Sequence, residues 1–504
     1  MNRHFKKFMP KLLLLAPILF SLLSCSKDAD LLSDYVINKK DDISGVYSLL
    51  VNDTYFSDMK SSILLDVLNN DTFENFNNVT VVATTTPELG TVVINENNTL
   101  TYTPPTPPVV NETEAATVEI EPTPQETQEE IVDTFVYTTE ETSIAGTVTT
   151  AEATVTVKMI TVNNDVEYWK LKFDAEWVDK DNQVDSFDAL SKAKSGNVNQ
   201  EYYYLGYYVD GLIKIWQATG DNKYLDRALN LINLTVSDAV SVGNGYLGWP
   251  NNDNDGHALW DSFYWRYVAT LLRIMHQSPQ LRASGNYEQQ YQQLLNFTEK
   301  NIWERYEAQG LNNFYRINTH MASHWARIGM ELFIITGKTK YKTVFDNISF
   351  AQMLNRPSNL RNQLKPNSIV PSAYTWSQNW DSYRIQDTSH AGAIISFIIT
   401  AYENDMYWNK ADIDALTSTV NDVIWKPEYG IQFMKNVDGT GGYDLPGRLN
   451  EWLNLGRFNQ SLQNRIKNYY TGMNLTFYGI QPLGIAALNA RILADGKPIY
   501  PEQY

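Results

Sequence analysis

A repeated helical pattern in the C-terminal two-thirds of this 504-residue chain constrains its fold more than any other feature. Two long apolar stretches end in the same motif, Thr-Gly-x-x-Lys-Tyr, which begins at Thr219 and again at Thr336. The spacing of 117 residues is about two helical hairpins of ordinary length, and a fixed period is typical of repeat architectures. The sequence therefore predicts apolar inner helices that alternate with more polar outer helices.

The repeat can be extended to five predicted hairpins. We expect inner helices near 200–218, 257–277, 320–336, 388–403 and 472–493, with outer partners near 222–236, 287–304, 340–355, 409–424 and 460–470. Such hairpins can grow into an open solenoid or close into an (α/α) toroid. Closure is favoured because long loops rich in polar and aromatic residues precede the inner helices, and a closed ring would gather them at one end.

The N-terminal third follows a different pattern. Short β-rich runs alternate with turn residues at 80–84, 90–94, 99–103, 133–137 and 153–157, which predicts a small β-sandwich that resembles bacterial Ig-like or cadherin-like modules. A Pro/Glu/Thr-rich stretch at 104–130 is too polar to pack and is expected to be a loop. The fold class is therefore multidomain, with an Ig-like β-sandwich at 48–163 followed by an all-α (α/α) toroid at 165–504. Calcium is conceivable at the aspartates of the sandwich, but turn roles are commoner, so we predict no metal and no cofactor; the aspartates are Asp66, Asp71 and Asp133.

The charge distribution excludes one class of partner. A net charge of −18 has the wrong sign for a protein that must displace counterions from nucleic-acid phosphates. Residues 26–165 carry 24 Asp and Glu against 5 Lys and Arg, whereas residues 166–504 carry 34 acids against 31 bases. The nearly neutral helical part is therefore compatible with an anionic substrate. All 13 tryptophans lie at or beyond Trp169, which supports the same two-part division.

The first 24 residues have the pattern of a signal peptide. Four basic residues precede an apolar run from Leu12 to Leu23, which is too short to span a membrane. The run ends in Leu-Leu-Ser-Cys25, which contains the single cysteine of the chain and resembles the lipobox of bacterial lipoproteins. The resemblance implies lipidation of Cys25 and an outer-membrane lipoprotein, because acyl chains anchor a protein without a spanning helix. The next residues, Ser-Lys-Asp-Ala-Asp, resemble the acidic export signal of lipoproteins displayed on the cell surface, and they begin a predicted linker at 25–47.

Histidines gather at the predicted starts of inner helices: His257, His320, His324 and His390. A single histidine is more often structural, but four at equivalent repeat positions predict one shared cleft. His320 and His324 have the spacing of a metal pair. No Glu lies between them in the zincin arrangement and the chain has no pair of cysteines, so no metal is predicted.

Two motifs resemble the active site of toroidal polysaccharide lyases. Asn318-Thr-His320 is similar to their Asn-x-His helix start, and Arg384-x5-His390 is similar to their Arg-x5-(His/Tyr) segment. The resemblance implies that Asn or His neutralises a uronate carboxylate while His or Tyr moves protons, as β-elimination next to a carboxylate requires. Toroidal alginate lyases have a tyrosine where this chain has Ala391, so Tyr383 is the predicted catalytic tyrosine and Tyr443 the reserve.

Among these lyases the whole chain most resembles the ulvan lyases of marine Bacteroidetes, which cut sulfated rhamnose–uronate chains. The resemblance implies an anionic polysaccharide as substrate, and we expect endo action by a monomer. The predicted catalytic residues are Asn318, His320, Tyr383, Arg384 and His390. The predicted substrate-binding residues are Trp249, His257, Trp260, His324, Trp380, Asp387, Tyr443 and Arg448.

Two other functions remain open from the sequence. A glycoside hydrolase on uronate oligosaccharides needs two carboxylic groups flanking the scissile bond, and the candidates are Asp253, Asp255, Asp261, Asp387, Asp444 and Glu451. Asp387 can instead orient His390 or Arg384. The third function is a non-catalytic glycan-binding lipoprotein at the cell surface.

Overall fold

The structure is a computed structural model of the chain. It describes residues 49–503 apart from 58, 60–61, 69–70, 74–77, 106–130, 144–145, 160–164, 183–187, 251–257, 431, 445–448 and 470–477. The predicted signal peptide, Cys25, the whole predicted linker and all but the first two residues of the predicted loop at 104–130 lie outside the described residues. Of the helices that are described, none has both the length and the apolar character needed to cross a membrane.

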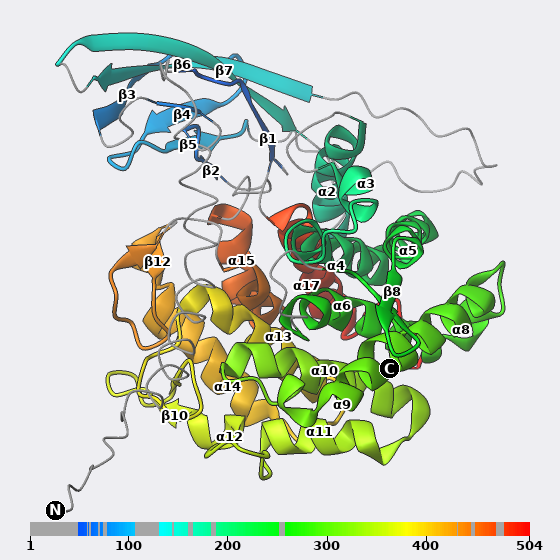
Figure 1. The fold of residues 1–504 in the computed structure, drawn as a ribbon. Helices are drawn as coiled ribbons and strands as arrows, with labels where there is room; N and C mark the ends of the chain where they lie inside the picture. The colour runs from blue at the N-terminus through cyan, green and yellow to red at the C-terminus, as the bar shows by residue number, and fades with distance from the viewer. Residues whose placement is uncertain are drawn as a thin grey trace, which may run out of the picture.

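The N-terminal region forms two small sheets on one side of the helices (Figure 1). The four-stranded sheet has the order β1-β7-β6-β3 and the three-stranded sheet the order β2-β5-β4. β1 and β7 are parallel, and the other pairs are antiparallel. The strands are β1 (Asp53–Ser57), β2 (Ile63–Leu65), β3 (Val79–Thr84), β4 (Thr91–Ile94), β5 (Leu100–Thr103), β6 (Ile131–Thr142) and β7 (Val148–Met159).

The two sheets share one hydrophobic core, as expected for a sandwich. Side chains alternate between buried and exposed along β6 and β7, so one face of the sheet packs inward. Tyr102 stacks on Phe135 between the sheets, at 6.2 Å between ring centroids. The carboxylate of Asp133 accepts the Tyr102 hydroxyl and the backbone N–H groups of residues 88–90. Asp133 therefore stabilises the turn at residues 88–90, which is the commoner role expected for these aspartates.

Six inner elements form a closed ring in the described part of the helical region. Each packs against the next in the chain, and the last packs back on the first. They are α4 (Glu201–Thr219), α6 (Ala258–His276), α10 (Thr319–Thr336), α13 (Thr388–Tyr402), the 3-10 helix η7 (Asn450–Phe458) and α17 (Gln481–Asp495). This closure distinguishes a toroid from an open solenoid.

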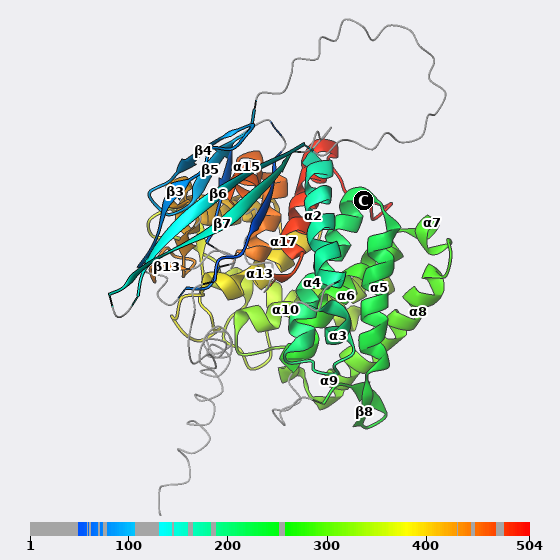
Figure 2. The same cartoon turned by 90° about the horizontal axis from the view of Figure 1, so that it is seen from above.

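Outer helices return the chain between the inner elements (Figures 1 and 2). They are α5 (Asn222–Ser237), α8 (Tyr287–Phe297) continued by η3 (Thr298–Glu304), α11 (Thr339–Ser349), α14 (Lys410–Ser418) continued by η5 (Thr419–Ile424), and α15 (Gln460–Tyr469). The helix that follows the sandwich, α2 (Asp165–Asn182), packs against α17 and α4.

Short elements occupy the connections. They are α3 (Ala189–Ala193), β8 (Val240–Gly243), β9 (Tyr246–Gly248), α7 (Pro279–Arg282), α9 (Arg305–Gln309), η4 (Leu311–Asn313), α12 (Leu360–Gln363), β10 (Lys365–Pro366), β11 (Tyr374–Thr375), η6 (Pro427–Tyr429), β12 (Phe433–Met434) and β13 (Tyr443–Asp444).

The Thr-Gly-x-x-Lys-Tyr repeat has a local physical cause. Gly220 and Gly337 end α4 and α10 with left-handed φ values of 73° and 70°, which glycine adopts without a Cβ penalty. Four residues later, the Tyr224 and Tyr341 hydroxyls each donate 2.5 Å to a carboxylate outside the new outer helix, on α2 and η3 respectively. Each copy of the motif therefore ends an inner helix, and its tyrosine joins the next outer helix to an earlier segment by a hydrogen bond.

The ring differs from the sequence prediction at its fifth element, η7. η7 was not predicted as an inner helix because its polar residues break the apolar pattern. Those residues are bonded inside the ring: Glu451 pairs with Arg266, and Arg457 pairs with Glu403. Residues 472–493 were predicted as one inner helix, but α17 begins only at Gln481, and residues 470–477 are outside the described part.

Candidate functional site

Three loops meet at the end of the ring where the inner elements begin. The Thr319 N–H at the start of α10 donates to the Gln378 carbonyl at 2.8 Å, and the Thr388 N–H at the start of α13 donates to the Lys435 carbonyl at 2.7 Å. The Val437 N–H donates to the Gln386 carbonyl at 3.0 Å. The segments before α10, α13 and η7 are therefore joined by backbone hydrogen bonds, as ring closure predicts.

Asp387 organises the start of α13. It is the N-cap, and its Oδ1 accepts the backbone N–H of His390 at 2.9 Å. The same oxygen lies 2.8 Å from Nδ1 of the His390 ring, and it accepts the Ser389 hydroxyl at 2.6 Å. Burial by itself would raise the pKa of Asp387, but the His390 charge and these hydrogen bonds outweigh it and hold the pKa well below its usual range. Asp387 is therefore a charged partner of His390 near neutral pH.

His320 reaches the same place from α10. Its ring centroid is 4.5 Å from that of His390, and its side chain is buried. Burial, followed by the charge of His390, lowers the pKa of His320 well below 6.5, so its imidazole is neutral at pH 7. Burial and Arg266 do the same to His324, one turn further into the ring. Each of these two neutral histidines can donate one hydrogen bond and accept another, but neither supplies a positive charge.

Several polar atoms of this cluster lack a protein partner. Asn318, the N-cap of α10, is 3% exposed, and its Oδ1 makes no hydrogen bond within the described residues. The same holds for Nδ1 of His320 and Nδ1 of His324. Buried polar groups without a partner cost about 1–3 kcal/mol each, so a native structure keeps them where a ligand or water completes them.

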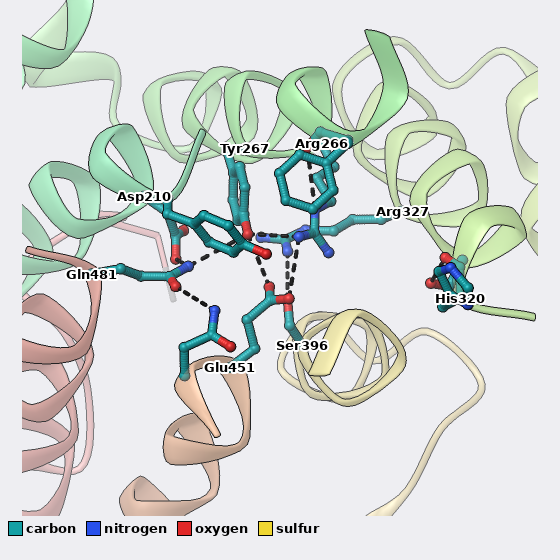
Figure 3. A network of polar contacts seen from close by, with 12 residues as sticks. Asp210, Arg266, Tyr267, His320, Arg327, Ser396, Glu451 and Gln481 are labelled. Carbon is teal, nitrogen blue, oxygen red and sulfur yellow. Dashed lines mark hydrogen bonds and ion pairs between the residues drawn. The ribbon is translucent and has the colours of Figure 1, made fainter. Parts of the chain in front are cut away.

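A buried polar network fills the ring beneath the histidines (Figure 3). Arg266 Nη2 pairs with Glu451 Oε2 at 3.1 Å and donates to the Tyr267 hydroxyl at 2.6 Å. The Tyr267 hydroxyl donates to the other Glu451 oxygen at 3.2 Å. Figure 3 shows His320 to one side of this network. Because the charge of Arg266 is balanced by Glu451, the network positions side chains and leaves no free cation at Arg266.

An aromatic cluster borders the histidines. Tyr203 of α4 stacks on Phe263 at 4.2 Å between ring centroids, and it meets Trp260 edge to face at 5.7 Å. Phe263 in turn lies 5.4 Å from the His324 ring. Burial raises the pKa of Tyr203, and Asp387 adds to that effect, so its hydroxyl keeps its proton near pH 7. The sequence prediction missed Tyr203, although the run of tyrosines at 202–204 and 207–208 was a visible signal.

The structure brings together part of the predicted catalytic set. Asn318, His320 and His390 lie at one place, with Asp387 and His324 beside them. Tyr383 and Arg384 do not join them: Tyr383 is 99% exposed, and the Arg384 side chain is also on the surface. The reserve tyrosine, Tyr443, is 47% exposed and packs edge to face on Tyr429.

Two predicted sugar-stacking tryptophans belong to the core instead. Trp249 is 5% exposed, donates its indole N–H to the Thr235 carbonyl at 2.8 Å, and packs on Trp265. Trp380 is 3% exposed and donates to the Arg316 carbonyl at 2.6 Å. This corrects the prediction for both, because neither has an exposed ring face. Trp260 is buried but borders the cluster through Tyr203, whereas His257 and Arg448 lie outside the described residues.

Two of the carboxylates that could serve hydrolysis are already held in buried ion pairs. Asp261 forms an ion pair with Arg305 and accepts the Tyr306 hydroxyl at 2.9 Å, and Glu451 is held by Arg266. Asp253 and Asp255 lie outside the described residues. In the part of the chain that the structure describes, no three His, Cys, Asp or Glu side chains are grouped to hold a metal ion.

Comparisons with known proteins add little. An inactive variant of the α-1,6-mannanase GH76A of Salegentibacter sp. HEL1_6, in complex with α-1,6-mannotetrose, is 14% identical, with a TM-score of 0.32 over 62% of this chain and 100% of that chain. A second structure of that mannanase, in complex with α-1,6-mannotriose, is 13% identical with the same TM-score and coverage. No protein-family model and no curated protein matches the sequence. The assignment of a closed ring therefore depends only on the contacts between this chain's own helices.

Proposed function

We propose that this chain is a polysaccharide lyase that cleaves a uronate-containing polysaccharide by β-elimination. One observation carries the proposal: Asp387, His390 and His320 meet at the starts of two inner helices, beside the unsatisfied Asn318. This set offers a base held by a carboxylate, together with neutral hydrogen-bonding groups for a uronate. It needs neither a metal nor a pair of catalytic carboxylic acids.

His390 is the proposed base, and it acts in its neutral form. Its Nδ1 is bonded to charged Asp387, which fixes the ring orientation and stabilises the imidazolium that forms when a proton is taken up. Proton abstraction from the carbon next to the uronate carboxylate then takes place at Nε2. A side-chain base that takes this proton contributes about 10²–10⁴-fold to the rate.

Asn318 and His320 are proposed to bind the uronate carboxylate. Since His320 is neutral, it supports the developing enolate charge by hydrogen bonding, which is strong in a site that excludes water. Tyr203 is the proposed acid for the leaving oxygen, because its raised pKa keeps the hydroxyl protonated. It takes the role that the sequence predicts for Tyr383, whose side chain is fully exposed to solvent.

The proposal also covers the substrate and the cellular location of the protein. We infer an ulvan-type substrate from the resemblance of the sequence to ulvan lyases, and surface display from the lipobox at Cys25. Metabolic labelling with a palmitate analogue tests the anchor: the natural chain should be labelled, and Cys25→Ser should not. Labelling of both, or of neither, would contradict lipidation at Cys25.

The reaction is tested by ultraviolet absorbance and a reducing-end assay, run in parallel on the purified chain. The substrates are ulvan, alginate, glucuronan, chondroitin and neutral α-1,6-mannan. The proposal predicts that absorbance rises on a uronate polymer, since elimination creates a double bond conjugated with the carboxylate, and that His390→Ala abolishes the rise. New reducing ends without absorbance would establish a hydrolase. Binding without either signal would establish a glycan-binding protein.

A further inference from the structure

A fully buried glutamine lies where the loops of the candidate site meet. Gln386 directly precedes Asp387 in the chain and is 0% exposed. Its side-chain Nε2 donates to Oδ2 of Asp387 at 2.9 Å, and its Oε1 accepts from the hydroxyl of Thr319 at 3.1 Å. Thr319 is the first residue of α10 and directly precedes His320. Gln386 therefore joins the carboxylate that holds His390 to the helix that carries His320.

The chemistry of the two partners determines which way the amide of Gln386 points. A carboxylate without a proton only accepts hydrogen bonds, so the atom that faces Asp387 is the amide nitrogen and not the amide oxygen. The amide oxygen is then left to accept from Thr319. The Thr319 hydroxyl also lies 3.0 Å from the Gln378 carbonyl, so its single proton is shared between these acceptors. The amide thus has one orientation, with a donor on Asp387.

The bond from Gln386 reaches the second oxygen of Asp387. The donors at Oδ1 all belong to α13 itself: the Ser389 hydroxyl, the His390 backbone N–H and the His390 ring. Oδ2 lies 3.0 Å from Nδ1 of that ring and accepts from Gln386. Rotation about the last side-chain bond of an aspartate is soft, so bonds to both oxygens are needed to fix the plane of the carboxylate. Gln386 supplies a bond from outside the helix.

Gln386 is itself held by its backbone. Its N–H donates to the Trp376 carbonyl at 2.9 Å, and its carbonyl accepts from the Val437 N–H at 3.0 Å. With the Thr319 bond, these contacts come from the segments before α13, before η7 and at the start of α10. A buried amide costs free energy unless it is hydrogen-bonded, and here both polar ends of the side chain are bonded. Gln386 is therefore a fixed support for Asp387.

The plane of the Asp387 carboxylate matters for the chemistry of His390. A carboxylate beside Nδ1 accepts the proton carried there, so the neutral ring has its proton on Nδ1 and leaves Nε2 free to take up another. An imidazole without such a partner populates both tautomers. If the carboxylate turned away, part of the His390 population would carry its proton on Nε2 and could not act as a base at that atom.

We propose that Gln386 is a positioning residue, which holds the Asp387 carboxylate in the plane that keeps the His390 proton on Nδ1 and presents Nε2 to the substrate. Because Gln386 is fully buried, it acts through Asp387 and does not touch the substrate. The effect on turnover rests on the proposed function, in which His390 is the base. The effect on the His390 tautomer does not depend on the reaction.

Gln386→Met tests the proposal, because methionine has a similar length and volume but no amide. Gln463→Met is the matched control: Gln463 is also buried, its Nε2 donates to the Ala486 carbonyl at 3.0 Å, and its Oε1 accepts from Asn489 at 3.0 Å. It joins α15 to α17, away from the candidate site. Thermal unfolding and initial rates are measured on the full chain. The tautomer is read by nitrogen NMR with isotope-labelled histidine, and the signal lost in His390→Ala identifies His390.

We expect both variants to lose a similar amount of Tm, since each loses a buried hydrogen-bonding amide. Gln386→Met should lower kcat about tenfold to a hundredfold, with little change in KM, and the neutral His390 ring should become a mixture of tautomers. Gln463→Met should keep the natural kcat and the Nδ1–H tautomer. The proposal is overturned if His390 keeps its proton on Nδ1 in Gln386→Met, or if Gln463→Met changes the tautomer equally.

The NMR measurement separates this inference from the proposed function. If the natural chain cleaves no polysaccharide, the proposed function fails, and the tautomer in Gln386→Met still decides the role of Gln386. If the chain is a lyase but the tautomer does not change, only the inference fails. Should Gln386→Met not fold, Thr319→Val takes its place, because it removes the bond from α10 that holds the amide. It should give a smaller change of tautomer, and an unchanged tautomer would overturn the proposal.

Discussion

Nδ1 of His390 lies 2.8 Å from Oδ1 of Asp387, the N-cap of the same helix. One carboxylate thus ends a loop, starts α13 and orients an imidazole. The local sequence Asp-Thr-Ser-His is enough to make this pair. The ring fold is what adds His320 from the neighbouring inner helix, with 4.5 Å between the two ring centroids.

Asp387→Asn should separate catalysis from folding. Asparagine keeps the N-cap hydrogen bond to the His390 N–H but removes the charge that stabilises the imidazolium. We expect turnover to fall about a hundredfold or more, with little change in Tm. Initial rates and thermal unfolding on the same preparation check this. Unchanged turnover would show that Asp387 only caps the helix.

Tyr203→Phe should abolish most turnover, because the ring keeps its stacking on Phe263 but the hydroxyl is gone. Tyr383→Phe is the matched control, and it should leave the rate within about twofold, since a fully exposed side chain does not reach the reacting atoms. Initial rates on the best polysaccharide provide the measurement. The reverse result would return the catalytic role to Tyr383.

The lowered pKa values of His320 and His324 predict an acid-sensitive fold. Below their usual value of 6.5 the unfolded chain binds protons that the folded chain does not, so stability falls as the pH decreases through that value. Tm should therefore drop between about pH 8 and pH 5. His324→Gln should flatten this dependence, measured by thermal unfolding across the range. An equally steep curve in the variant would mean that other groups control it.

Glu451→Gln should destabilise the ring by about 3 kcal/mol, because it leaves the buried charge of Arg266 without its partner. Glu288→Gln is the control: its ion pair with Arg282 is much more exposed, and its loss should cost less than about 1 kcal/mol. Urea unfolding of both variants measures the difference. Equal effects would contradict a structural role for the buried pair.

Gly484→Ala should loosen the closure of the ring. A Cβ at Gly484 would lie 2.4 Å from the Gly211 carbonyl oxygen, where α17 crosses α4. We expect a loss of about 1–3 kcal/mol in urea unfolding, as for other overpacked sites. Gly206→Ala meets only the Tyr267 and Phe263 rings, at 3.3 Å or more, and should cost less. Equal stability of Gly484→Ala and the natural chain would show that α4 and α17 are not in close contact.

The sequence was most informative where local chemistry decides the structure. The Thr-Gly-x-x-Lys-Tyr repeat identified inner and outer helices correctly because a left-handed glycine ends the helix in both copies. The β-rich runs likewise match β3 to β7, since alternation along a strand is local.

The rest depends on tertiary contacts. η7 carries Glu451 and Arg457, which look too polar for an inner element until their partners on other helices are known. Trp249 seemed suited to a sugar because it sits in a polar loop, but its indole N–H is bonded to Thr235 in the core. The tyrosine run at 202–204 does not reveal that Tyr203 stacks on Phe263, whose ring in turn contacts His324.

The central claim is that bonds are broken by elimination, and the reaction in heavy-oxygen water tests it most directly. Mass spectrometry of the products from the most susceptible polysaccharide shows whether solvent oxygen has entered them. Elimination predicts products without heavy oxygen at the cleaved linkage and with one unsaturated uronate end. One heavy oxygen per cleavage would mean hydrolysis and would contradict the account.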